Sequence, residues 1–142
     1  MPAKSLARTQ RQLPDSEKLT INLGHVDLGR IDLLVNEGFY STRSDFIRTA
    51  VRQHLLGYAA TVQDTVARKT LRLGLHHITR AELEAAAASG VPLHIRVLGL
   101  ASIAPDATPE LVRAAIGSIE VLGTLMASAA VKSALADRMG AR

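Results

Sequence analysis

The sequence predicts an α/β protein in two parts, an N-terminal part that dimerises and a C-terminal module of β-α repeats with parallel strands. Three observations predict this fold class. Residues 18–23 alternate polar and apolar side chains, the period of a strand with one buried face. Two amphipathic helical patterns follow, to about residue 56. From residue 70 onward a Leu-Gly pair recurs, each time within an apolar run.

The overall composition is that of a folded protein. Of the 142 residues, 47% are hydrophobic and 21% are charged, and the formal net charge is +4. This mild basic excess is compatible with a nucleic-acid partner. The chain has no cysteine, which excludes disulfides and thiol chemistry. We expect neither a signal peptide nor a membrane-spanning segment, and therefore a cytoplasmic, nucleoid-associated protein.

Residues 1–16 predict a flexible basic arm. They carry Lys4, Arg8 and Arg11 with two prolines and few apolar groups. Chain ends of this composition are usually untethered. Such an arm could remain a plain tail, or it could follow the backbone or minor groove of DNA.

The alternating segment has one apolar and one polar face. Its apolar residues are Leu19, Ile21 and Leu23, and its polar residues are Lys18, Thr20 and Asn22. A single strand is not stable by itself, and no second strand lies within reach in this part of the chain. The predicted partner is therefore the same strand of another copy, which gives a dimeric, two-stranded antiparallel ribbon over four helices.

Two helices are predicted after the strand. The first spans about residues 26–36, and Gly38 provides the turn that follows it. The second begins after Ser41 or Thr42, either of which can cap it, and Asp45 lies three residues after Thr42, close to the capping-box spacing.

The ordered set of Lys18–Leu23, a helix, a glycine turn, Ser41-Thr42-Arg43-Ser44-Asp45 and a second helix resembles the ribbon-helix-helix DNA-binding fold of the MetJ/Arc/CopG class. The resemblance covers residues 17–57. It implies that the polar face of the ribbon, Lys18, Thr20 and Asn22, contacts bases in the major groove of double-stranded DNA. It also implies that the N-terminus of the second helix, with Ser41, Thr42 and Arg43, contacts the phosphate backbone.

The chemistry of these residues suits both roles. Lysine donates to guanine, asparagine pairs with adenine, and threonine offers a hydroxyl and a methyl group. A helix N-terminus presents free N–H groups and a positive dipole end to a phosphate, and Arg43 adds a full charge. The alternatives are a solvated strand face and an ordinary helix cap.

The C-terminal repeat follows a helical linker predicted over residues 58–69. Its Leu-Gly pairs begin at Leu73, Leu98 and Leu122. After each apolar run comes a cap residue, Thr79, Thr108 or Ser128, then a short helical pattern that we expect to stop at Gly90, Gly117 and Gly140. Strand-helix units of this length predict right-handed crossovers and parallel strands. Residues 70–142 are thus predicted to form an assembly or sensing module, with an ACT-like ferredoxin fold of order βαββαβ, as in nickel-responsive relatives, as the alternative.

No arrangement of catalytic residues emerges, and there is no glycine-rich phosphate loop, so we expect neither enzymatic activity nor a cofactor. The only metal-ligand candidates are His76, His77 and His94. The repeat separates His94 from the other two along the strands, so no metal site is expected within one chain. Whether they meet across chains is left open.

These features together predict a homodimeric, sequence-specific transcriptional repressor or autoregulator. Residues 70–142 are expected to join dimers into a higher oligomer, so the predicted partners are double-stranded DNA and the protein itself, without a membrane. The first alternative is a structural or partition-type protein tethered to DNA. The second is a metal- or ligand-responsive repressor.

Overall fold

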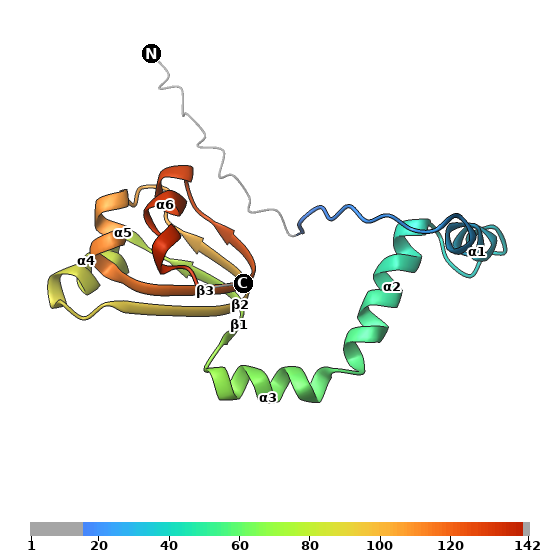
Figure 1. Cartoon of the computed structure of the whole chain (residues 1–142), viewed down its shortest axis with the longest axis horizontal. Helices are drawn as coiled ribbons and strands as arrows, with labels where there is room; N and C mark the ends of the chain where they lie inside the picture. The colour runs from blue at the N-terminus through green and yellow to red at the C-terminus, as the bar shows by residue number, and fades with distance from the viewer. Residues whose placement is uncertain (1–15, 141–142) are drawn as a thin grey trace, which may run out of the picture.

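The computed structural model describes residues 16–140, so the predicted basic arm lies outside the described residues except for Ser16. Helices α1 to α3 extend away from a C-terminal sheet that is covered by short helices (Figure 1). The two parts match the division of the sequence into an alternating-and-helical half and a repetitive half.

Residues 18–23 are exposed and form no strand among the residues that the structure describes. The antiparallel ribbon predicted here needs a second copy, because a strand without a partner has no hydrogen-bond ladder. Helix α1 (His25–Asn36) starts one residue before the predicted Val26. Gly38 then adopts a φ of 85°, the left-handed conformation that glycine tolerates best.

Helix α2 (Arg43–Leu56) is capped by Thr42, and helix α3 (Ala59–Lys69) occupies the predicted linker. Neither helix contains a buried residue. Among the large apolar side chains left exposed on α2 are Val51, Leu55 and Leu56. An amphipathic helix is stabilised mainly by burying its apolar face, and within residues 16–140 the later part of that face on α2 is uncovered.

The C-terminal module contains a parallel sheet, which confirms the predicted β-α repeat. Strands β1 (Arg72–Ile78), β2 (Leu93–Ile103) and β3 (Ile116–Met126) lie in the order β1-β2-β3. Helices α4 (Arg80–Ser89), α5 (Pro109–Ala115) and α6 (Ala129–Ala134) follow the strands in turn, and a 3-10 turn, η1 (Ala136–Arg138), comes last. This element order differs from the βαββαβ order of an ACT-like fold.

Local capping explains where these helices begin. Thr79, Thr108 and Ser128 each accept a hydrogen bond from the backbone N–H three residues later, and Thr79 and Glu82 complete a full capping box. Gly90 ends α4 with a left-handed φ of 71°.

The other two predicted helix stops are wrong. Helix α5 ends at Ala115 and runs directly into β3, so Gly117 is a strand residue. The reason is the fully buried Ile116, which pairs with Leu93 at the start of the β2–β3 ladder. Helix α6 ends at Ala134, well before Gly140, because the chain turns through η1 back to the edge of β3.

The three repeats are aligned on a ladder of glycines. Gly74 pairs with Gly99, and Gly99 pairs with Gly123. Their φ angles are 111°, 135° and 120°, so each strand leaves the regular extended conformation at the same level. A Cβ atom on Gly99 would collide with the carbonyl oxygen of Gly74, and one on Gly123 with that of Gly99. At Gly99 and Gly123, glycine is therefore required both by the positive φ and by the lack of space for a Cβ atom.

A single aliphatic core lies between the sheet and helices α4 to α6. Its members come from every repeat and include Ile78, Leu83, Val97, Val112, Ile116, Ile119, Val131 and Leu135. The C-terminal module therefore has a core of its own, whereas in residues 16–70 only Ile31 is buried.

Candidate nucleic-acid interface

The alternating segment before α1 carries the residues predicted to contact bases. Lys18, Thr20 and Asn22 are all exposed, at every second position of the segment. Their side chains therefore point to one side wherever this segment forms a regular strand.

The opposite side of the same segment is apolar and equally open. Leu19 is 84% exposed, Ile21 54% and Leu23 42%. Contiguous apolar groups of this kind usually mark a contact surface. The backbone N–H and C=O groups of an unpaired extended segment also attract a second strand.

The N-terminus of α2 carries the residues predicted to contact phosphate, and Asp45 ties two of them together. The hydroxyl of Thr42 accepts a hydrogen bond from the N–H of Asp45 at 3.0 Å. The carboxylate of Asp45 in turn accepts from the N–H of Ser41 at 3.1 Å and from its hydroxyl at 3.2 Å. Thr42 is therefore the cap, while Ser41 is held just outside the helix.

Arg43, the first residue of α2, forms a bidentate ion pair with Asp32 of α1. Its Nε and Nη2 atoms donate to the two carboxylate oxygens of Asp32, each at 2.7 Å. The hydrogen bonds and charge of Arg43 lower the pKa of Asp32. The pair spans the turn between the helices and holds the guanidinium at the N-terminus of α2.

A second contact supports the same turn. The rings of Tyr40 and Phe46 meet edge to face, with 4.9 Å between centroids and an interplanar angle of 83°. It links the residue before Ser41 to the first full turn of α2.

Sequence reasoning identified Ser41, Thr42 and Arg43 but missed Asp32 and Tyr40. Asp32 lies eleven residues before Arg43, beyond the range of a local capping pattern. The signal that could have found it is the position of an acidic residue near the end of α1, facing the turn that the glycine creates.

The residues predicted to contact bases and those predicted to contact phosphate flank α1 in the chain. Helix α1 has 12 residues, a length of about 18 Å at about 1.5 Å per residue. One chain thus presents Lys18, Thr20 and Asn22 before this helix and Ser41, Thr42 and Arg43 after it.

The three histidines considered as metal ligands each face a different neighbour. Nδ1 of His77 lies 2.7 Å from the hydroxyl of Ser102, and Nδ1 of His94 lies 2.8 Å from that of Ser118. His76 lies 3.4 Å from the guanidinium of Arg72. Within residues 16–140, no group of three or more His, Cys, Asp or Glu side chains could hold a metal ion.

No helix in the described part of the chain is long and apolar enough to cross a membrane.

Comparison with known proteins gives one match. The model of the ribbon-helix-helix transcriptional regulator family matches residues 14–132. No curated protein and no solved structure matches the chain. The family match extends through β1, β2 and β3, so it includes the C-terminal module as well as the segment that resembled the fold in sequence.

Proposed function

Because this chain belongs to the ribbon-helix-helix transcriptional regulator family, we propose that it is a homodimeric, sequence-specific DNA-binding repressor or autoregulator. Proteins of this family bind DNA and typically dimerise. The observation that carries the proposal is the exposed alternating segment 18–23, which is apolar on one side and polar on the other.

The apolar side supports dimerisation. Full burial of a Leu or Ile side chain contributes about 1.5–3 kcal/mol, and Leu19, Ile21 and Leu23 are open to solvent in one chain. Pairing two copies of the segment supplies both the hydrogen-bond ladder and a cover for these side chains. Val51 and Leu55 on α2 add further apolar surface to the same part of the dimer.

The polar side supports base recognition. A two-stranded ribbon fits the major groove, and the ribbon would present Lys18, Thr20 and Asn22 from each chain toward the base edges. Twofold symmetry then leads to an operator composed of two inverted half-sites.

The N-terminus of α2 supports phosphate binding. The first N–H groups of a helix have no acceptor within the helix, and here they lie beside Arg43. Because Arg43 uses Nε and Nη2 for Asp32, its Nη1 atom remains to donate to a phosphate oxygen. Asp32 would orient the guanidinium and also offset part of its charge. The contact of Arg43 with a phosphate would then depend more on the direction of its hydrogen bond than on its net positive charge.

We further propose that the C-terminal module joins dimers into a higher oligomer and has no catalytic role. Its core is separate from the helices that would contact DNA, which fits a function in assembly. The protein would then act in the cytoplasm, where its DNA is, without a cofactor.

The test is selection of bound sequences from random DNA with the full-length protein. We expect enrichment of an inverted repeat. Asn22→Ala should weaken binding to that site by about 1–3 kcal/mol and relax the choice at one base pair in each half-site. Asn36→Ala, an exposed asparagine at the end of α1, is the matched control and should leave the selected sequence unchanged.

Two outcomes would count against the proposal. Selection that enriches no sequence, combined with a broad footprint over many sites, would favour the DNA-tethered structural protein. An Asn22→Ala variant that loses affinity for all sequences alike would move Asn22 from base recognition to backbone contact.

A further inference from the structure

The two edges of the C-terminal sheet differ in how they are covered. At the β3 edge, Met139 forms a parallel bridge with Ile119, and the N–H of Gly140 donates to the carbonyl of Ile119 at 3.0 Å. The hydroxyl of Thr124, farther along β3, hydrogen-bonds the carboxylate of Glu17. The chain's own C-terminal segment therefore occupies the first half of this edge.

The β1 edge is open within the described residues. Strand β1 is the terminal strand of the sheet, and α3, which leads into it, projects away (Figure 1). Leu73 is 70% exposed and Leu75 84%. The segment Arg72–Ile78 contains no proline, lysine or acidic residue, and its protection against pairing is limited to Arg72 at its start and the irregular backbone at Gly74.

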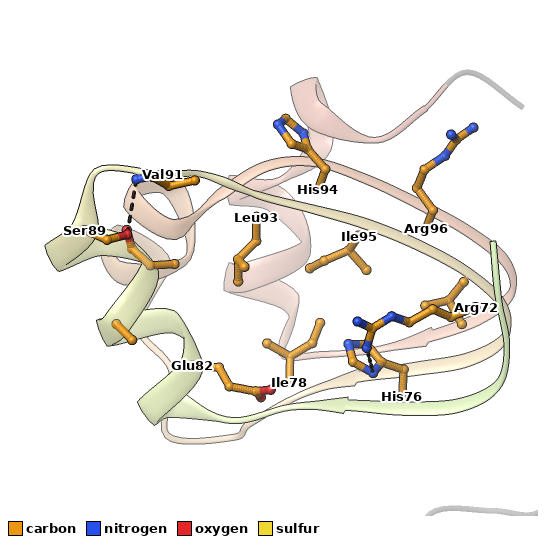
Figure 2. Close-up of a pocket in the computed structure, with 13 residues that line it drawn as sticks. Arg72, His76, Ile78, Glu82, Ser89, Val91, Leu93, His94, Ile95 and Arg96 are labelled. Atoms are coloured by element: carbon orange, nitrogen blue, oxygen red, sulfur yellow. Dashed lines mark hydrogen bonds between the residues drawn. The ribbon is translucent and has the colours of Figure 1, made fainter. Parts of the chain in front are cut away.

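The end of the module at β1 is also hollow. A cavity of about 550 Å³ lies beside β1 between α4 and the first half of β2. Figure 2 shows Arg72 and His76 on one side of it, with Glu82 of α4 nearby and Ile95 directed inward. In the same view His94 and Arg96 point away from Arg72 and Glu82, toward the other side of β2.

Two side chains of opposite charge at this cavity, Arg72 and Glu82, form no ion pair within the described residues. By contrast, Arg80 pairs with Glu84 and Arg96 with Glu120. Glu82 uses its Oε2 atom in the cap of α4, which leaves Oε1 to accept from another donor.

We propose that the β1 edge binds the β1 edge of a second copy, in antiparallel orientation, and that this contact joins two ribbon dimers. It deepens the proposed function, because the ribbon supplies the first dimer contact and β1 the second. A twofold axis perpendicular to the sheet keeps the helices of both copies on one side. The Arg72 end of one strand then lies beside the Ile78 end of the other, where α4 carries Glu82.

The charges are complementary in this arrangement. Each Arg72 approaches the partner's Glu82, and the two hollows face each other and close. Head-to-tail stacking of β1 on β3 is obstructed, because Met139 and Gly140 already occupy the start of the β3 edge. The twofold contact by itself joins two copies, and a closed assembly of four chains forms when both β1 edges of one ribbon dimer meet those of a second.

The test is sedimentation equilibrium of full-length variants at micromolar concentration. The wild-type protein should sediment as four chains or more. Leu75→Lys adds a charge to the open edge at a solvent-exposed position, so it should reduce the assembly to dimers without loss of helical signal. Leu122→Lys makes the same change on β3, at the level of Leu73, and should leave the mass unchanged.

A charge exchange tests the geometry. Arg72→Glu should also give dimers, and the Arg72→Glu, Glu82→Arg double variant should regain at least part of the larger species. Failure of both Leu75→Lys and Arg72→Glu to lower the mass would overturn the proposal.

Ile21→Lys separates this inference from the proposed ribbon. If both contacts exist, Ile21→Lys alone gives dimers held by β1, and Ile21→Lys combined with Leu75→Lys gives monomers. A mass that falls with Ile21→Lys but not with Leu75→Lys contradicts only the β1 contact. The reverse result contradicts only the ribbon.

Discussion

Arg43 donates two hydrogen bonds to Asp32, and this pair orients the guanidinium at the N-terminus of α2, where we propose that a phosphate binds. A free arginine would add a full positive charge to the site. The pair keeps the guanidinium in one orientation and makes the local charge nearly neutral. Both side chains are exposed, so the pair positions Arg43 more than it stabilises the fold.

Arg43→Ala should weaken binding to every DNA sequence to a similar degree and make the salt dependence of the affinity shallower by about one unit. Asp32→Asn should do the opposite, because it removes the offsetting charge while retaining a similar shape. Affinity titrations at several salt concentrations measure both. Arg30→Ala, on the exposed side of α1, is the control. An equal loss of DNA affinity in this variant would mean that Arg43 acts only through its contribution to the net charge.

At the level of the elements, the glycine ladder lies where β1, β2 and β3 pair most closely. The three glycines share a positive φ, but their surroundings differ. A Cβ on Gly99 or Gly123 would collide with backbone of the preceding strand, whereas one on Gly74 would meet nothing within 4 Å.

Gly99→Ala should therefore destabilise the C-terminal module more than Gly74→Ala does. The positive φ alone costs about 1–3 kcal/mol in either variant, and the collision adds to it only at Gly99. Gly29→Ala, in the middle of α1 and with open space around it, should instead stabilise that helix by about 0.5–1 kcal/mol. Urea unfolding measures all three, and equal losses at Gly74 and Gly99 would contradict the role of close packing.

At the scale of the whole molecule, the two parts obtain their stability in different ways. The C-terminal module buries its own aliphatic core within one chain. The N-terminal part leaves Leu19, Ile21, Leu55 and other large apolar side chains exposed, so its folding should depend on a second copy.

We therefore expect two thermal transitions. The melting temperature of the N-terminal part should rise with protein concentration because its folding is coupled to dimerisation through the ribbon. Ile21→Lys would bury a charge in the shared core, should cost several kcal/mol, and should abolish that transition while the C-terminal one remains. Calorimetry at two protein concentrations measures this, and unchanged melting of a folded dimer would contradict the ribbon.

The sequence by itself determined the features that depend on neighbouring residues. The Thr79 capping box and the starts of α5 and α6 follow from hydrogen bonds between residues three positions apart, whereas the sequence allows either Ser41 or Thr42 as the cap of α2 and the structure decided for Thr42. The spacing of the Leu-Gly pairs predicted the parallel register, because equal repeats place equal residues side by side. The period of residues 18–23 predicted the two faces of a strand, and the structure gives this segment no strand partner within residues 16–140.

Only the tertiary structure decided the features that depend on residues far apart in the chain. Gly117 became a strand residue because the buried Ile116 pairs with β2. Arg43 acquired Asp32 as a partner because the Gly38 turn brings two helices together. Met139 and Gly140 cover the start of one edge of the sheet, whereas the β1 edge is uncovered within residues 16–140. Such contacts cannot be found from local spacing, since their free energy arises from packing between elements that the chain first has to fold back and bring together.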